Sequence, residues 1–181
     1  MSKVYAIIGP TASGKTAIIS ELKKYGLREI KRYTISKLNQ DISSDEFHYV
    51  SEEEFNNLDF FHTFEYDNNV YGFTKKDIIK VIQQEPVSLI QIDKEGLDLL
   101  YHLLGEKVES IYIMLDPVNI VQRLLDKNID TYTIQLKLNS AEKADDFSQW
   151  EFADHIIKNT ADLDLAVKQA LAIMGFMKPK I

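Results

Sequence analysis

The residues with the clearest chemical meaning stand near the start of the chain, where the stretch "GPTASGKT" runs from Gly9 to Thr16. It matches the pattern G-x-x-x-x-G-K-[ST], in which glycines let the backbone curl and point successive N–H groups at anionic oxygens. We expect Lys15 to reach the β- and γ-phosphates of a nucleoside triphosphate, and the Thr16 hydroxyl to bind Mg²⁺. The predicted ligand is a nucleoside triphosphate with its metal ion. The residues expected to contact it are Gly9, Ala12, Ser13, Gly14, Lys15 and Thr16.

The elements on either side of this stretch are those that a phosphate-binding loop requires. The apolar run Val4–Ile8 predicts a buried strand, and Thr16–Tyr25 predicts a helix with Ile18, Ile19 and Leu22 on one face. A strand before the loop places it at a sheet edge, and a helix after it adds the positive end of its dipole. The competing interpretation is a glycine-rich turn with an exposed lysine, and this context argues against it.

The rest of the chain alternates between short apolar segments and helical patterns. Strands are predicted at residues 28–34, 87–92, 110–115 and 154–158, and helices at residues 75–84, 96–104, 117–125 and 163–174. Strands that alternate with helices indicate a parallel sheet with helices on both faces. The predicted fold class is α/β, a P-loop NTPase core in a single domain.

Two segments interrupt this alternation. Residues 34–75 predict a small mixed insertion, with a loop at 36–45, a short helix opened by a capping box of Ser51 and Glu54, and an aromatic–polar hairpin. Residues 127–147 are polar and mostly helical in pattern. The core that remains comprises residues 1–33, 76–126 and 148–181.

Composition excludes several classes of function. The 181 residues contain no cysteine, so disulfides, thiolate metal sites and cysteine nucleophiles are excluded, and the four histidines are not spaced as metal ligands. The net charge of −7 is unfavourable for binding a nucleic-acid backbone. The start of the chain lacks the pattern of a signal peptide, and no apolar run is long enough to span a membrane. We expect a cytoplasmic protein that binds neither membranes nor nucleic acid.

Four blocks in the middle and at the end of the chain resemble the guanylate kinase family. They are "FHYVSEEEF", "FEYDNNVYGFT", "IQIDKEG" and "ADHIIKNTADLDLAV", in family order and near family spacing. The resemblance extends from Val4 to about Ala170. It implies a core that binds ATP, a small domain that binds a nucleoside monophosphate, and a lid that closes over both. The interruptions at 34–75 and 127–147 stand where the small domain and the lid belong.

The resemblance assigns roles to residues outside the phosphate loop. Glu65 and Asp93 match the carboxylates that read guanine, and Tyr71 matches a tyrosine that contacts the acceptor phosphate. The lid cations that match or replace family arginines are Arg123, Lys127 and Lys137, and Asn159 matches the asparagine at the ATP site. Each also has a plain structural interpretation. Glu65 could be a solvated hairpin charge, Asp93 a helix cap and Tyr71 a core aromatic residue.

The departures from the family pattern fall at the acceptor end. Thr34 is kept, but Ser36 and Asn39 stand where two arginines clamp the acceptor phosphate, and neither side chain can form that bidentate contact. The other replacements are Phe47 for a phosphate-contacting tyrosine, Gln91 for an aspartate near the magnesium and Arg32 for a base-reading serine. Lys31, Arg32 and Lys37 either restore the lost charge in another geometry or are solvated surface charges.

Three functions are consistent with these residues. The first is an ATP-dependent nucleoside monophosphate kinase that acts on GMP or a related nucleotide. The second is a catalytically weakened module that binds a nucleotide or a protein partner, as the eroded acceptor site suggests. The third follows from "GPTASGKT", which also resembles the loop of the tRNA dimethylallyltransferases, although that family is much longer and binds RNA. The intact Lys15 favours an enzyme.

Overall fold

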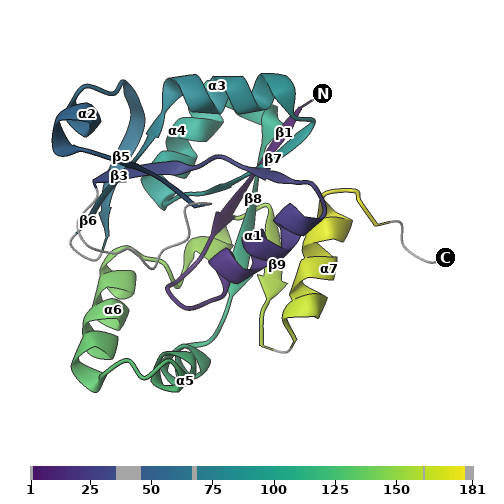
Figure 1. The fold of residues 1–181 in the computed structure, drawn as a ribbon. Coiled ribbons are helices and arrows are strands. Elements are labelled where there is room, and N and C mark those ends of the chain that lie inside the picture. The colour runs from purple at the N-terminus through teal and green to yellow at the C-terminus, as the bar shows by residue number, and fades with distance from the viewer. Residues whose placement is uncertain (1, 36–45, 67–68, 161, 178–181) are drawn as a thin grey trace.

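The main sheet has five parallel strands with helices on both faces, as the sequence predicts. The computed structural model describes residues 2–35, 46–66, 69–160 and 162–177 (Figure 1). The strand order is β2-β7-β1-β8-β9, and every neighbouring pair is parallel. The strands are β1 (Lys3–Ile8), β2 (Arg28–Glu29), β7 (Val87–Gln91), β8 (Val108–Met114) and β9 (His155–Lys158).

Strand β1 shows how one sequence fills two cores. Side chains alternate across a strand, so Tyr5 and Ile7 pack on one face, while Val4, Ala6 and Ile8 pack on the other. The first face is covered by α1 (Lys15–Lys24) and α7 (Leu163–Ile173), and the second by α3 (Lys75–Gln84) and α4 (Lys94–Leu104). The strand is therefore buried on both sides, as its unbroken apolar sequence requires.

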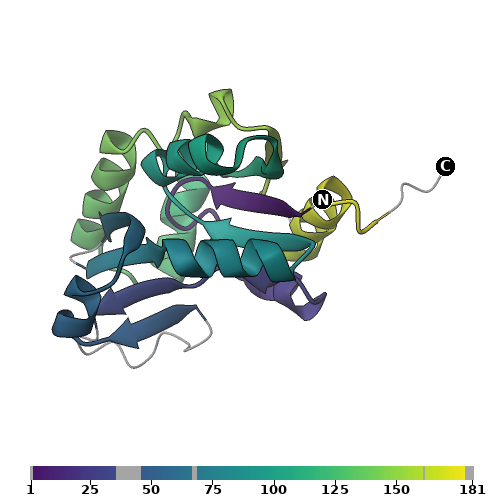
Figure 2. The same cartoon turned by 90° about the horizontal axis from the view of Figure 1, so that it is seen from above.

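A second sheet of four strands lies beside the main sheet, at the end of the molecule away from α7 (Figure 2). Its order is β4-β3-β6-β5, with the predicted hairpin formed by β5 and β6. The strand bounds are β3 (Arg32–Ile35), β4 (Phe47–Val50), β5 (Phe60–Tyr66) and β6 (Asn69–Thr74). The capping box of Ser51 and Glu54 is present, and it opens α2 (Glu52–Asn56).

The single strand predicted at residues 28–34 is in fact two strands in different sheets. β2 pairs with β7 of the main sheet, whereas β3 pairs with β4 and β6 of the small sheet. Ile30 still donates its N–H to the Leu89 carbonyl, and the chain leaves the main sheet just after it. A continuous apolar–polar pattern cannot reveal this change of partner, because hydrogen-bond partners are chosen by tertiary structure.

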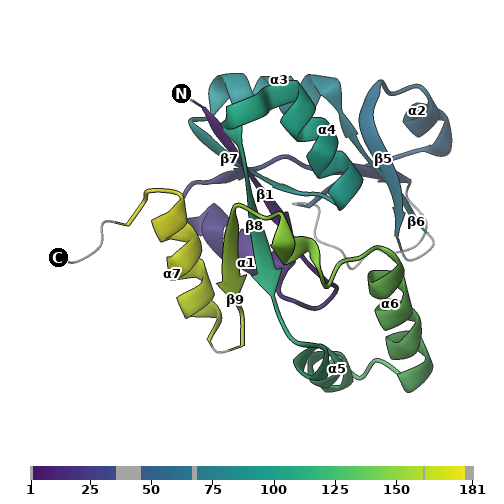
Figure 3. The ribbon, with the colours of Figure 1, turned by 180° about the vertical axis from the view of Figure 1, so that it is seen from behind.

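The predicted helical segment at 127–147 contains α6 (Thr131–Lys143), which follows α5 (Pro117–Asp126). Both helices project from the main sheet, as Figure 3 shows from behind. Ile134 of α6 packs with Leu115, Ile120 and Leu124 in a small apolar cluster. Within the described ranges, none of the helices combines the length and apolar character needed to cross a bilayer.

Replacement of Ser51 by alanine tests the capping box at the start of α2. The Ser51 hydroxyl accepts from the Glu54 N–H, and the Glu54 carboxylate accepts from the Ser51 N–H. Loss of this pair should lower the free energy of unfolding by about 1 kcal/mol, measured by urea denaturation. Ser20→Ala is the control, because Ser20 is an exposed residue within α1. Equal stability of the two variants would contradict the assignment.

Candidate active site

A cavity of about 810 Å³ lies between the phosphate loop, the small sheet and the α5–α6 segment. The loop after β1 forms one end, and the side chains of the small sheet form the other. The cavity also borders the carboxyl end of β7, where Gln91 and Asp93 lie. Ligands of open parallel sheets bind outside the carboxyl ends of the strands. The cavity therefore lies where the fold favours a ligand, and its walls join the two predicted halves of the site.

The phosphate loop is a tight curl that depends on its glycines. Gly9 has φ +132° and Gly14 has φ +103°, and Ala12 between them also has a positive φ of 57°. A Cβ atom on Gly9 would lie 2.7 Å from the Ile113 carbonyl oxygen of β8. The curl thus packs directly on the backbone of the neighbouring strand. It ends at Lys15, where α1 begins and its first N–H groups are available to an anion.

Lys15 folds back over the loop that carries it. Its ammonium donates to the carbonyl oxygens of Gly9, at 2.6 Å, and of Pro10, at 2.7 Å. Burial lowers the pKa of Lys15 to about 8, the nearby Asp146 carboxylate acts to raise it, and the charge of Arg32 acts to lower it. Among the described residues, the hydrogen bonds of this partly buried cation go to carbonyl oxygens, which it is poised to exchange for the oxygens of an anionic ligand.

Arg123 and Asn159 hold the loop from outside. Arg123 donates to the Ser13 carbonyl at 3.1 Å and to the Asn159 carbonyl at 2.6 Å, and the Asn159 amide donates to the Ser13 carbonyl at 2.7 Å. Asn159 is buried and lies close against Gly14, where a Cβ atom would be 2.4 Å from its side-chain nitrogen. The structure thus gives both residues a supporting contact with the loop. Arg123 also lines the cavity.

The other predicted residues of the ATP end lie in different settings. Lys127 and Lys137 both line the cavity from the α5–α6 side, with the Lys137 ammonium 5.5 Å from the centroid of the Tyr66 ring. Ser13 is fully buried within the loop. The Thr16 hydroxyl donates to the Gln91 side-chain oxygen at 3.3 Å. These two oxygens are hard donors that fit a Mg²⁺ ion brought in by a triphosphate, although Gln91 adds no negative charge.

At the acceptor end, Asp93 is both a helix cap and a cavity residue. One carboxylate oxygen, Oδ1, accepts from the Gly96 N–H at 3.0 Å and contacts His62 Nε2 at 2.7 Å. No hydrogen bond to the second oxygen comes from the described residues. The Asp93 side chain is 38% exposed and lines the cavity. The cap thus fixes the carboxylate and leaves one oxygen for a ligand.

Glu65 and Tyr71 also reach the cavity, whereas Thr34 does not line it. Glu65 is exposed on β5, and Tyr71 is a buried aromatic residue of β6 that stacks on Phe64 at 5.5 Å between ring centroids. The Thr34 hydroxyl is buried and donates to the Val70 carbonyl at 2.9 Å, which ties β3 to β6. Ser36, Lys37 and Asn39 lie outside the described residues.

Sequence patterns gave no indication of two charged or titratable residues at the site. Asp146 lines the cavity and accepts from the Gln149 amide at 2.8 Å, and burial raises its pKa to about 6. His62 is buried and fixes Asp93 through the hydrogen bond described above. Neither residue belongs to a short motif. His62 and its partner Asp93 are 31 residues apart, and Asp146 lies far along the chain from Lys15, so only the fold brings these groups together.

Comparison with known proteins identifies the family. The sequence model of the guanylate kinase family matches residues 1–175. The chain belongs to this family. It is 24% identical over 175 residues to a guanylate kinase of Wolbachia sp. subsp. Brugia malayi, covering 91% of this chain and 88% of that protein. It is 29% identical over 183 residues to the guanylate kinase of Ehrlichia chaffeensis, covering 96% and 86% of the two chains.

The fold is that of a solved guanylate kinase. The crystal structure of guanylate kinase from Anaplasma phagocytophilum superposes with a TM-score of 0.73 at 20% identity, covering 98% of this chain and 88% of that chain. The predicted α/β class and the predicted family are both confirmed. At identities of 20–29% the comparisons show the family and the fold, not the roles of individual site residues. The roles of those residues are therefore argued from the geometry of this chain.

Gly9→Ala tests the dependence of the loop on its first glycine. An alanine would carry an unfavourable φ and a Cβ atom 2.7 Å from a backbone oxygen, so we expect a loss of about 3 kcal/mol or more in the free energy of unfolding. Gly26→Ala is the matched control, since Gly26 also has a positive φ but its Cβ would meet nothing within 4 Å. This control should lose only about 1–2 kcal/mol. Equal losses in chemical denaturation would show that the contact with β8 is unimportant.

Proposed function

We propose that the protein is an ATP-dependent nucleoside monophosphate kinase that transfers the γ-phosphoryl group of ATP to GMP. The observation that carries this proposal is the single cavity, which joins the phosphate loop and Lys15 to the acceptor side chains Glu65, Tyr71 and Asp93. Two nucleotides that occupied its two ends would meet between the loop and the lid cations. Membership of the guanylate kinase family supports the same reaction.

The ATP end would bind the triphosphate through the loop amides and the start of α1. Lys15 would leave the carbonyls of Gly9 and Pro10 and bind the β- and γ-phosphate oxygens. The Thr16 hydroxyl would hold a Mg²⁺ ion, which would supply positive charge to neutralise the phosphates. Lys127 and Lys137, which line the opposite wall, would add positive charge around the transferred group.

The phosphoryl group passes directly from ATP to the acceptor, and the protein forms no covalent bond with it. An anionic oxygen of the acceptor phosphate attacks the γ-phosphorus, the bond from that phosphorus to the β–γ bridging oxygen breaks, and ADP leaves. No general base is required, because the attacking oxygen already carries a negative charge. Catalysis then consists of positioning and of stabilising the charge that develops on the transferred group. The cations Lys15, Arg123, Lys127 and Lys137 are the described residues suited to this role.

Recognition of guanine would depend on two carboxylates. Guanine presents N–H and amino donors, and a carboxylate can accept from both. The unpartnered oxygen of Asp93 and the exposed carboxylate of Glu65 both border the acceptor end of the cavity. His62 would act as a positioning residue, since its hydrogen bond and the Gly96 N–H fix the orientation of Asp93.

The two other functions considered from the sequence gain no support. A protein-interaction module has no need for an intact loop lysine or for a cavity that joins both nucleotide ends. The family match covers residues 1–175 and therefore includes the blocks that distinguish guanylate kinases from tRNA dimethylallyltransferases. Neither alternative is proposed here.

A nucleotide screen tests the proposed reaction. With Mg-ATP and each ribo- and deoxyribonucleoside monophosphate in turn, ADP formation measured by a coupled assay should be fastest with GMP. Lys15→Ala should lower the rate at least about a hundredfold, because it removes a charge that stabilises the transferred phosphoryl group. Lys24→Ala is the control, since Lys24 is exposed on the same helix and pairs with Glu21. ADP formation with none of the acceptors would contradict the proposal.

The pH dependence of ATP binding tests the role of Lys15. The pKa of Lys15 is about 8 in the free protein, and a bound polyanion must raise it. The free protein therefore loses this proton at a lower pH than the complex, so the affinity should fall about tenfold between pH 7 and pH 9. Lys15→Arg should bind ATP with no such decline, because arginine stays charged. Calorimetric titration measures both, and an equal decline in the two proteins would refute the assignment.

A further inference from the structure

Arg32 is a buried arginine for which the described residues provide no ion pair. Arg32 is the first residue of β3, and it is only 9% exposed. Its Nε atom is buried and has no hydrogen-bond partner. Burying a guanidinium without partners is costly, because the group remains charged and carries five donors. A side chain kept in this state at the wall of a cavity is suited to an anionic ligand.

The aromatic residues around Arg32 give this charge a defined position. The guanidinium carbon lies 4.7 Å from the centroid of the Phe47 ring and 5.8 Å from that of Tyr71. Phe47 and Tyr71 themselves are neighbours, with ring centroids 5.6 Å apart. Stacking on these rings holds the guanidinium plane without using its N–H donors. The donors thus remain available to a ligand in the cavity that all three residues line.

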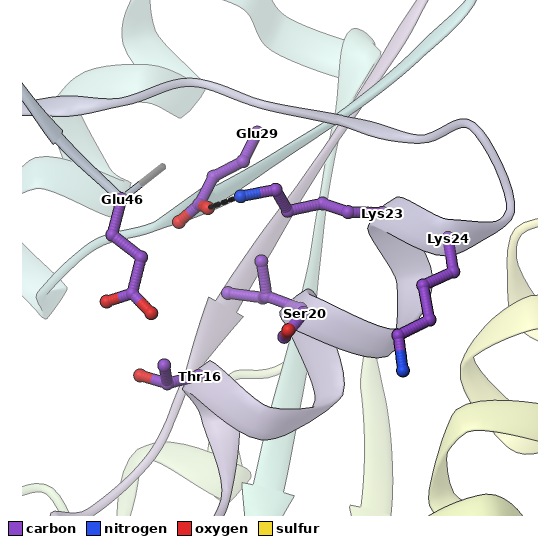
Figure 4. Close-up of a pocket in the computed structure, with 7 residues that line it drawn as sticks. Thr16, Ser20, Lys23, Lys24, Glu29 and Glu46 are labelled. Carbon is purple, nitrogen blue, oxygen red and sulfur yellow. Dashed lines mark ion pairs between the residues drawn. The ribbon is translucent and has the colours of Figure 1, made fainter. Parts of the chain in front are cut away.

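The carboxylates of Glu29 and Glu46 lie near Arg32 but leave its N–H donors free for a ligand. Glu29 is buried, and its carboxylate is directed at the Lys23 ammonium, 3.5 Å away, as Figure 4 shows. Glu46 lies on the adjoining segment and borders both the main cavity and a smaller one of about 320 Å³. Both carboxylates favour the charged form of Arg32 from a distance, since neither forms an ion pair with it.

The charge of Arg32 also reaches the phosphate loop. Burial is the main cause of the lowered pKa of Lys15, and the positive charge of Arg32 acts in the same direction. Two cations that repel each other across one cavity form a favourable site for a group whose negative charge lies between them. In the proposed reaction that group is the acceptor phosphate, which must lie beside the γ-phosphate held by Lys15.

We propose that Arg32 binds the phosphate of the acceptor nucleotide and supplies from β3 the guanidinium contact that Ser36 and Asn39 cannot make. This inference rests on the proposed function, because it assigns a residue to the acceptor site. The planar guanidinium group of Arg32 can donate two parallel N–H hydrogen bonds to phosphate oxygens.

The test compares binding of GMP with binding of guanosine, which has no phosphate. The protein should bind GMP at least about thirtyfold more tightly than guanosine, as two charge-assisted hydrogen bonds would provide. Arg32→Met keeps much of the length and apolar contact of the side chain. It should weaken GMP binding about 10- to 100-fold and change guanosine binding less than threefold. Arg32→Lys keeps the charge but not the planar guanidinium group, so its affinity for GMP should lie between that of the parent protein and that of Arg32→Met.

Two controls make the measurement specific. Arg28→Met removes another arginine, one that is exposed on β2 and paired with Glu85 at 3.0 Å, and it should leave the GMP-to-guanosine ratio unchanged. ATP affinity measured on each variant reports whether the loop and the fold are intact. If Arg32→Met does not fold, Arg32→Lys provides the same comparison of GMP with guanosine, with a smaller expected loss of GMP affinity of about fivefold.

The outcomes separate this inference from the proposed function. Equal loss of GMP and guanosine binding in Arg32→Met would overturn it in favour of a structural or base-reading role. Unchanged GMP binding in that variant, or a parent protein that does not prefer GMP to guanosine, would also overturn it. A preference for GMP that depends on Arg32, without any formation of GDP, would support the inference while contradicting the kinase function.

Discussion

The site depends on one constraint, the curl of backbone between β1 and α1. A loop that points its N–H groups inward must turn its carbonyl groups elsewhere, and those oxygens need donors. Lys15 satisfies Gly9 and Pro10, while Arg123 and Asn159 satisfy Ser13. The curl is therefore held by donors from the loop itself, from α5 and from the segment after β9. Lys15 would turn from these carbonyls to a bound anion, and Arg123 and Asn159 would then hold the curl.

The second condition for the site is that the chain changes sheets between Glu29 and Arg32. The main sheet supplies the phosphate loop and the carboxyl end of β7, and the small sheet supplies the aromatic wall and Glu65. Because β2 and β3 are consecutive in the chain, the two sheets are joined beside the cavity. Arg32 lies at the first position after this change, which places its side chain at the junction.

The resemblance to the guanylate kinase family predicts that the two ends of the cavity differ in how far they depart from the family pattern. The loop keeps every residue of its motif, since each one either shapes the backbone or carries the required charge. At the acceptor end the resemblance predicts that arginines and a tyrosine are replaced, while two carboxylates and aromatic residues line the cavity. A guanidinium group can bind a phosphate from more than one direction, whereas few sequences can form the tight curl of the phosphate loop. This difference in tolerance is the physical reason to expect changes at the acceptor end.

The sequence by itself determined the phosphate loop, the parallel sheet, the hairpin, the capping box and the family, because each depends on residue types at short and fixed spacing. Only the tertiary structure decided which side chains meet. It divided residues 28–34 between two sheets, assigned Thr34 to a buried hydrogen bond, and joined His62 to Asp93 across 31 residues. It also brought Asp146 close to Lys15 and stacked Arg32 on two aromatic rings. Such contacts join residues far apart in the chain, and no local pattern records them.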